Sequence, residues 1–259
     1  MRLAVTLLIA SSIWAGFLGC GPAPPKMQLD AEDQFLLAKK KYDEHKYLDA
    51  QTEFQKLIWN FPGSDYVDEA QFYLAECFFY QEDFPSAIHE YQRLLNNYSQ
   101  SPFVDIAQYK VGLSYYKQSL PAQLDQDFTH KAIRELETFL EEDPNSEQVP
   151  EAQNLLFASR TKLAHKEYLS GRLYYKMGEY ASALIYFEEI LETYPDTKWA
   201  DDAQFAIGEC YRRQKKWTQA LKSYQQLLEM SSSESLVRRT KNRIDEVEKK
   251  LEESQKSPG

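Results

Sequence analysis

The apolar positions of the chain return at helical spacing, and two short phrases return with them. The first phrase contains an Ala-Gln pair and stands at Glu69-Ala70-Gln71-Phe72, Ile106-Ala107-Gln108-Tyr109, Glu151-Ala152-Gln153-Asn154 and Asp202-Ala203-Gln204-Phe205. The second is an aromatic residue, then alanine three residues later, then another aromatic; it begins at Tyr47, Phe84, Tyr180 and Trp217. Residues three and four apart share one face of a helix, so each phrase predicts an amphipathic helix. The chain is therefore interpreted as a series of two-helix units.

These units resemble the tetratricopeptide repeat, a helix-turn-helix motif of about 34 residues. The alanines of the second helices stand at 50, 87, 132, 183 and 220, with spacings of 37, 45, 51 and 37. Two units thus carry insertions, at 118–129 and 146–163. Because no strong helix breaker occurs from Glu151 to Lys176, one long helix is predicted there.

The predicted fold class is an all-α solenoid of about five helix-turn-helix units closed by a C-terminal capping helix. Units one to three occupy 31–145, and units four and five with the cap occupy 146–259. The cap is predicted over Glu234–Gln255, where Val237, Ile244 and Leu251 recur every seven residues. The end of a solenoid must be covered by a helix with a polar outer face. The alternative for this helix is docking to a partner.

Small residues occur at matching places in the first helix of each unit, where two helices can approach closely. They are Ala38, Ala75, Gly112, Gly171 and Gly208. Cys77 and Cys210 each follow such a residue by two positions, in units two and five. Several units separate them, which is more than the ~7 Å between Cα atoms that a disulfide spans. We therefore expect two free, buried thiols.

The N-terminus has the pattern of a targeting segment. One cation, Arg2, precedes an uncharged run from Leu3 to Phe17 that is short for a membrane span and typical of a signal peptide. The following Phe17-Leu18-Gly19-Cys20 resembles a bacterial lipobox. This resemblance implies that 1–19 is removed and that Cys20 carries the acyl chains, palmitate among them. Residues 20–30 are then a tether, stiffened by prolines. An ordinary secretory signal is the alternative.

Charge and motif content exclude several functions. The net charge of −10 becomes −11 once Arg2 is removed, which disfavours nucleic-acid binding. The four histidines form no metal-binding pattern, and no phosphate-binding loop or nucleophile elbow occurs. We therefore predict a protein that is not an enzyme and that holds no metal and no cofactor.

The first helix of each unit is expected to line the concave face of the solenoid, which would be rich in rings. In units one to three the predicted peptide-binding groove consists of Phe35, Tyr42, Phe72, Phe79, Tyr80, Tyr109 and Tyr116. In units four and five the predicted partner-docking residues are Tyr168, Arg172, Tyr175, Phe205 and Arg212. An aromatic groove suits a peptide with apolar anchors. The alternative for any single ring is packing between units.

The assembled features resemble the BamD family, lipoproteins of the outer-membrane β-barrel assembly machinery. The resemblance is sharpest from Leu163 to Tyr168, at Tyr174-Tyr175 and Gly178-x-Tyr180, and at Tyr194-Pro195-Asp196-Thr197. It implies a lipid anchor at the periplasmic face of the outer membrane. It also implies binding of the BamA-like barrel insertase through the C-terminal half, together with accessory assembly lipoproteins. The N-terminal groove would receive C-terminal signals of unfolded outer-membrane proteins.

Two other functions compete with this reading. The first is a periplasmic tetratricopeptide lipoprotein that serves pilus assembly or cell-wall enzymes; the long helix disfavours it, because the units of such scaffolds tend to be uniform. The second is an enzyme accessory or a degenerate hydrolase; an enzyme would need titratable groups gathered in the groove. The sequence offers only His165 near Glu167 for that purpose.

Overall fold

The computed structural model describes residues 29–231 and 233–256, and eleven helices make up this part of the chain. The signal segment, Cys20 and the tether up to residue 28 lie outside the described residues. Among the described helices, none has the length and apolar composition to cross a bilayer. The helices are α1 (Ala31–Asp43), α2 (Tyr47–Asn60), α3 (Val67–Tyr80), α4 (Phe84–Asn97), α5 (Val104–Gln118), α6 (Asp127–Glu142), α7 (Val149–Met177), α8 (Tyr180–Thr193), α9 (Lys198–Arg213), α10 (Trp217–Met230) and α11 (Glu234–Lys256).

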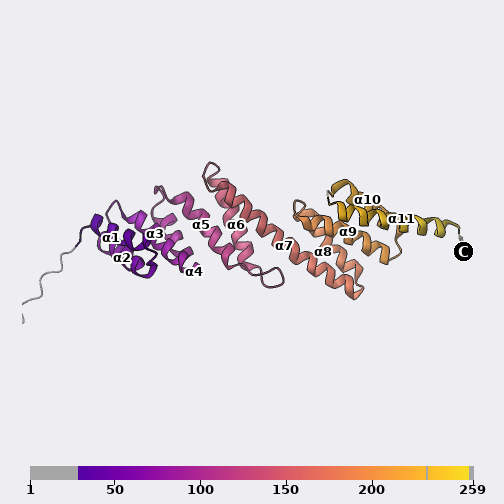
Figure 1. Cartoon of the computed structure of the whole chain (residues 1–259), viewed down its shortest axis with the longest axis horizontal. Coiled ribbons are helices and arrows are strands. Elements are labelled where there is room, and N and C mark those ends of the chain that lie inside the picture. The colour runs from indigo at the N-terminus through magenta and orange to yellow at the C-terminus, as the bar shows by residue number, and fades with distance from the viewer. Residues whose placement is uncertain (1–28, 232, 257–259) are drawn as a thin grey trace, which may run out of the picture.

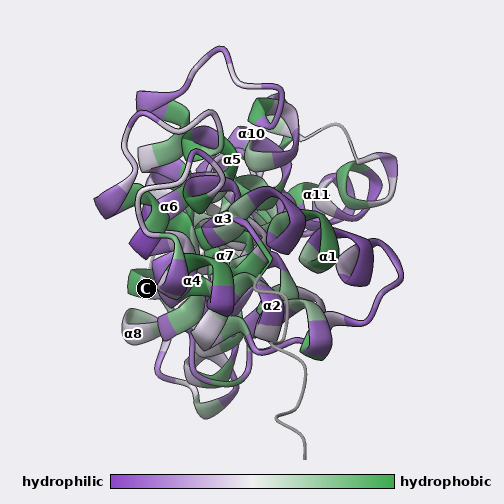
Figure 2. Cartoon of the chain, turned by 90° about the vertical axis from the view of Figure 1, so that its left-hand side faces the viewer, coloured by the Kyte–Doolittle hydropathy of each residue, from purple (hydrophilic) through white to green (hydrophobic). Residues whose placement is uncertain are grey.

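Successive helices pair into five hairpins, and each hairpin packs on the next. Figure 1 shows them following one another along an elongated molecule. Seen from its N-terminal end, hydrophobic segments gather toward the inside and hydrophilic ones toward the outside (Figure 2). The predicted all-α solenoid is confirmed.

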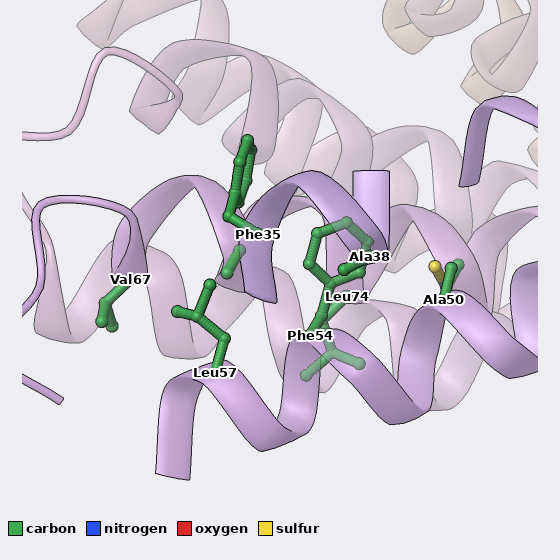
Figure 3. Close-up of a cluster of buried hydrophobic side chains, with 9 residues drawn as sticks. Phe35, Ala38, Ala50, Phe54, Leu57, Val67 and Leu74 are labelled. Atoms are coloured by element: carbon green, nitrogen blue, oxygen red, sulfur yellow. The ribbon is translucent and has the colours of Figure 1, made fainter. Parts of the chain in front are cut away.

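Each unit buries a small core between its own two helices and the next first helix. In unit one Phe54 and Leu57 of α2 are fully buried against Ala38 of α1 and Leu74 of α3 (Figure 3). The small residues are required by close approach. A Cβ on Gly208 would lie 2.4 Å from the ring of Tyr224.

The glutamine of the recurring phrase ties the two helices of a unit together. The side-chain amide of Gln71 donates to the backbone carbonyl of Glu90 at 3.0 Å and to its carboxylate at 2.7 Å. Gln34 makes the same two bonds to Glu53. A buried amide needs such partners, so this glutamine ties the two helices of units one and two together, and Gln204 likewise donates to the backbone carbonyl of Ser223 at 2.8 Å in unit five.

The tight turns between paired helices repeat one backbone conformation. Seven residues after the small residue, the chain is left-handed at His45, Glu82, Lys215 and Gly178, with φ of 58°, 60°, 58° and 84°. Only unit four uses glycine, the residue that adopts this region without strain.

The long helix predicted from Glu151 to Lys176 is confirmed as α7, which belongs to two units at once. Its first half packs on α6, where Ala152 is fully buried, and its second half pairs with α8. Ala70 precedes its small residue Ala75 by five positions, whereas Ala152 precedes Gly171 by nineteen. Fourteen extra residues of helix shift unit four by about 21 Å along α7. Figure 1 shows α7 as the only bridge in that region between the two halves of the described chain.

The unit-three insertion, predicted over 118–129, is the loop between α5 and α6 with the first residues of α6. It is fastened to α7, because Lys162 donates to the hydroxyl of Ser119 and Lys166 donates to the carbonyl of Leu124. At the other end of the chain, α11 covers α10 as predicted for a cap, with Val247 fully buried.

The prediction of free thiols is also confirmed. Cys77 and Cys210 are both buried and unpaired. Burial raises the pKa of each thiol to about 12, so both remain protonated and poorly reactive.

Candidate functional site

Units one and two present a continuous set of tyrosine rings beside one another. Tyr42 of α1 meets Tyr73 and Tyr80 of α3 edge to face, with ring centroids 4.9 and 6.1 Å apart. Tyr80 also stacks on Tyr47 at 5.2 Å. Edge-to-face and stacked pairs hold rings in fixed positions. We call Tyr42, Tyr73, Phe79 and Tyr80, together with Tyr116 of α5 in unit three, the aromatic surface.

Glu76 lies buried beneath this surface and organises it. The hydroxyls of Tyr91 and Tyr42 both donate to its carboxylate, Tyr42 at 3.4 Å. Lys110 of α5 forms an ion pair with it at 2.8 Å. Burial, followed by the charge of Glu76, raises the pKa of Tyr42 and of Tyr91, which keeps both phenols as hydrogen-bond donors.

Three lysine ammonium groups lie over the rings of the aromatic surface. The ammonium of Lys39 lies 5.0 Å from the ring centroid of Tyr73, that of Lys110 lies 4.5 Å from Phe79, and that of Lys162 lies 5.1 Å from Tyr116. These are cation–π distances. The surface therefore combines apolar rings with positive charge at their faces.

The structure separates the predicted groove residues into two groups. Tyr42, Phe79, Tyr109 and Tyr116 are half-buried, and Tyr80 is 49% exposed. Phe35 and Phe72 are only 6% and 5% exposed, which corrects the expectation that they line an open face.

The two buried rings point into the interfaces between helices. Phe35 stacks on Tyr66 at 5.2 Å, and Phe72 stacks on Phe103 at 4.8 Å. A ring three residues before the small residue thus contacts the start of the next unit instead of solvent. Tyr109 also turns inward in part, with its ring 5.9 Å from that of Phe139.

The second half of the solenoid repeats the buried carboxylate with different cations. Glu209 accepts from the hydroxyl of Tyr224 at 2.6 Å, from Arg212 at 2.8 Å and from Arg243 at 2.8 Å. Burial by itself raises the pKa of Glu209. The hydrogen bonds from Arg212 and Tyr224 and the charges of both arginines outweigh burial and leave this pKa below its usual range.

Most of the predicted docking residues are already engaged within the chain. Phe205 is 4% exposed beneath Arg239, whose guanidinium lies 3.9 Å from the ring, so the expectation of an open Phe205 is corrected. Arg212 bridges Glu209 and Glu246. The other three differ in exposure: Tyr168 packs on Phe187 and Trp199, Tyr175 contacts Tyr180, and Arg172 is exposed.

Sequence reasoning missed an uncovered apolar face on unit four. Two residues after the small residue, Cys77, Ser114 and Cys210 are fully buried by the preceding second helix. The matching Leu173 is 58% exposed, because the extra turns of α7 carry unit four beyond α6. Met177 and Ile185, the latter on α8, are 64% and 67% exposed. We call Leu173, Met177 and Ile185 the unit-four face.

The spacing of nineteen residues between Ala152 and Gly171 is the sequence signal that could have revealed this face. No cluster of three metal-ligating side chains occurs among the described residues.

Comparison with known families decides the broad class. A model of the YfiO family, described as outer membrane lipoproteins, matches residues 27–227. The chain belongs to this family. Outer membrane protein assembly factor BamD of Caulobacter vibrioides is 28% identical over 99 residues, which are 38% of this chain and 32% of that protein. The match thus spans about a third of this curated relative. Membership supports an association with the outer membrane.

Solved structures of other repeat proteins are distant. The TPR2AB domain of yeast Sti1, in a complex with pHSP90, is 13% identical over 78% of this chain and 77% of its own, with a TM-score of 0.44. The P58(IPK) tetratricopeptide domain is 16% identical over 88% and 67%, with a TM-score of 0.42. The fold assignment rests on the helix hairpins of the chain itself.

Proposed function

We propose that this YfiO-family member is a non-enzymatic scaffold lipoprotein of outer-membrane protein assembly. In this proposal Cys20 carries the lipid anchor at the periplasmic face. The aromatic surface binds C-terminal signals of unfolded outer-membrane proteins. The observation that carries the proposal is that surface itself, an array of rings fixed by one another, by Glu76 and by crossing lysines. The assembly role of the BamD relative supports the same assignment.

The chemistry of the aromatic surface matches a peptide with aromatic anchors. Rings held at fixed angles lose little conformational freedom on binding, and covering the exposed part of each ring removes apolar area from water. Tyr80 and Phe79 offer edges and faces together, with centroids 5.7 Å apart. Such a surface selects alternate large side chains of an extended segment.

The same scaffold needs a second surface for the BamA-like insertase, and we place it on the unit-four face. In the other internal units the residues that match Leu173, which are Cys77, Ser114 and Cys210, are buried. A partner element that presents a leucine or aromatic stripe would restore the missing contact. The face lies in the C-terminal half, apart from the aromatic surface, so one chain could hold signal and insertase together.

The test of signal binding is a direct affinity measurement. Tyr42→Ala, Phe79→Ala and Tyr116→Ala combined should weaken binding of a barrel-signal peptide by at least about a hundredfold, since truncating each anchor ring costs on the order of 1–2 kcal/mol. Trp59→Ala is the control, because this ring on α2 is 84% exposed and touches none of the aromatic surface. Equal affinity of the triple variant, with normal helicity, would contradict the proposal.

The test of insertase docking is co-purification from the outer-membrane fraction. Leu173→Glu with Met177→Glu should reduce recovery of the insertase at least tenfold. Both side chains are exposed, so the fold should remain intact. Leu48→Glu is the matched control, since Leu48 is 71% exposed on α2. Recovery of pilus or cell-wall proteins by the wild-type chain, without the insertase, would favour the competing scaffold role.

A further inference from the structure

Three lysines cross the aromatic surface, and only two of them have a carboxylate partner. Lys39 pairs with Asp43 at 2.5 Å, and Lys110 pairs with Glu76 at 2.8 Å. Lys162, on α7, contacts the hydroxyl of Ser119 at 2.5 Å and the ring of Tyr116. In residues 29–231 and 233–256, no carboxylate lies within ion-pair distance of it.

Without a carboxylate partner among the described residues, the partly buried ammonium group of Lys162 has lost solvation that no ion pair replaces. Burial lowers the pKa of its ammonium group, and no acidic neighbour opposes that effect. A desolvated cation without a counter-ion gains more from an incoming anion than a cation that is already paired.

The hydrogen bonds around Lys162 leave room for a ligand. The hydroxyl of Ser119 donates to the carbonyl of Tyr116 at 2.6 Å, so its lone pairs accept one proton from the ammonium. An ammonium has three donors, and two therefore remain free. The neighbouring Lys166 is already committed to the carbonyl of Leu124 at 2.8 Å.

We propose that Lys162 binds the free C-terminal carboxylate of a peptide lying on the aromatic surface, with the last aromatic side chain of that peptide against Tyr116. The inference rests on the proposed function, because it concerns the same surface. It adds polarity and register: the chain terminus lies at the α5–α7 end, and the preceding residues run toward Tyr80 and Tyr42.

A carboxylate can come from the chain terminus or from an acidic side chain, and the test separates the two. We would measure affinities for a ten-residue peptide that ends in phenylalanine, prepared as the free acid, as the C-terminal amide, and as the amide with glutamate beside the phenylalanine. The wild-type protein should bind the free acid about tenfold more tightly than either amide, the scale of one charge-assisted hydrogen bond.

The same peptides are then measured with Lys162→Met and with a matched control. Lys162→Met should weaken binding of the free acid about tenfold and leave binding of the plain amide unchanged. In a double-mutant cycle, removing the ammonium and amidating the peptide should then cost the same affinity, singly or together. Lys131→Met should change neither affinity, because Lys131 lies over Tyr115 and Phe128, which are not rings of the aromatic surface.

Three results would overturn the inference, and they separate it from the proposed function. Equal binding of acid and plain amide by the wild type would remove the carboxylate site while peptide binding stands. The peptide amide with glutamate could bind the wild type as tightly as the free acid and bind Lys162→Met no better than the plain amide. That result would assign the site to acidic side chains. Binding of none of the peptides would overturn the proposed function as well. The comparison of acid with amide uses the unaltered protein, so it does not depend on how the variant folds.

Discussion

Units two and five build the same buried constellation and close it in different ways. Glu76 is followed after fifteen residues by Tyr91 and after thirty-four by Lys110, and Glu209 is followed at the same distances by Tyr224 and Arg243. In both units the tyrosine and the later cation bond the carboxylate. Lys110 comes from the next unit, whereas Arg243 comes from α11. The capping helix therefore takes the position of a sixth unit.

The difference lies in the number of charges. Glu76 has one cation, which also covers the rings of Phe79 and Tyr80. Glu209 has two arginines, and both of these also bind Glu246 of α11. The same arrangement of glutamate, tyrosine and cation thus supports the aromatic surface near the N-terminus and a cluster of ion pairs near the C-terminus. Because the arginines around Glu209 have a second carboxylate and, in the described part of the chain, Lys110 does not, we expect the loss of Glu209 to cost less unfolding free energy than the loss of Glu76.

The largest expected effect is on Glu76. Glu76→Ala leaves Lys110 without its carboxylate and the buried hydroxyl of Tyr91 without its acceptor, at a cost of about 3–5 kcal/mol. Glu209→Ala should cost less, because Arg212 and Arg243 keep Glu246. Urea unfolding followed by circular dichroism measures both. An equal loss of unfolding free energy in the two variants would show that the shared ion pair adds nothing.

Steric fit gives the next effect. Gly208→Ala places a methyl group 2.4 Å from the Tyr224 ring and should cost about 1–3 kcal/mol through displacement of that ring from Glu209. Gly63→Ala is the control, since a Cβ there meets nothing within 4 Å. Thermal unfolding compares the variants. A Gly208→Ala protein as stable as the control would mean that the ring shifts without loss.

Acid should act on the C-terminal cluster through Glu209. Its folded-state pKa lies below the unfolded value near 4.5, so its contribution is present above that pH and is lost as pH falls through the lower folded pKa. Glu209→Gln should therefore flatten the acid decline in unfolding temperature below about pH 4.5. The same decline in wild type and variant would assign it to other carboxylates, such as Glu53, whose pKa is lowered to about 2.

The smallest effect concerns the left-handed turns. Glu82→Gly and Lys215→Gly should each stabilise the chain by roughly 0.5–1 kcal/mol, because glycine accepts their positive φ. Gly178→Ala should destabilise by about 1 kcal/mol for the same reason. Thermal unfolding of the three variants would test the symmetry of the turns. A stabilising Gly178→Ala would contradict it.

Periodicity predicted the parts of the fold that depend on one helix and its neighbour. The alanines, the small residues, the continuity of α7 and the cap all followed from apolar spacing. The burial of Phe35, Phe72 and Phe205 did not follow from the spacing, because it depends on how closely the next unit packs over each ring. Predicting the exposure of Leu173 requires the spacing of nineteen residues between Ala152 and Gly171, which shifts unit four along α7.

The candidate site was predicted in part. The spacing of the repeat predicts Tyr42, Tyr80 and Tyr116 as inward-facing rings, and in the structure Tyr42 and Tyr116 are half-buried and Tyr80 is exposed. The same spacing places Lys39 on the inward face, whereas Lys110 and Lys162 were not predicted over rings, because each contacts a ring on a helix of another unit. The repeat length could have indicated some of these contacts, because Lys39–Tyr73, Glu76–Lys110 and Glu209–Arg243 are each thirty-four residues apart.

The central claim is that the aromatic surface of units one to three receives the peptide. Photocrosslinking tests it most directly, with a photoreactive amino acid placed at Tyr80 or Tyr116, and at Trp59 or Arg213 for comparison. A barrel-signal peptide should crosslink at Tyr80 and Tyr116 and be displaced by unlabelled peptide. Crosslinks at Trp59 or Arg213, with none at Tyr80 and Tyr116, would contradict the account.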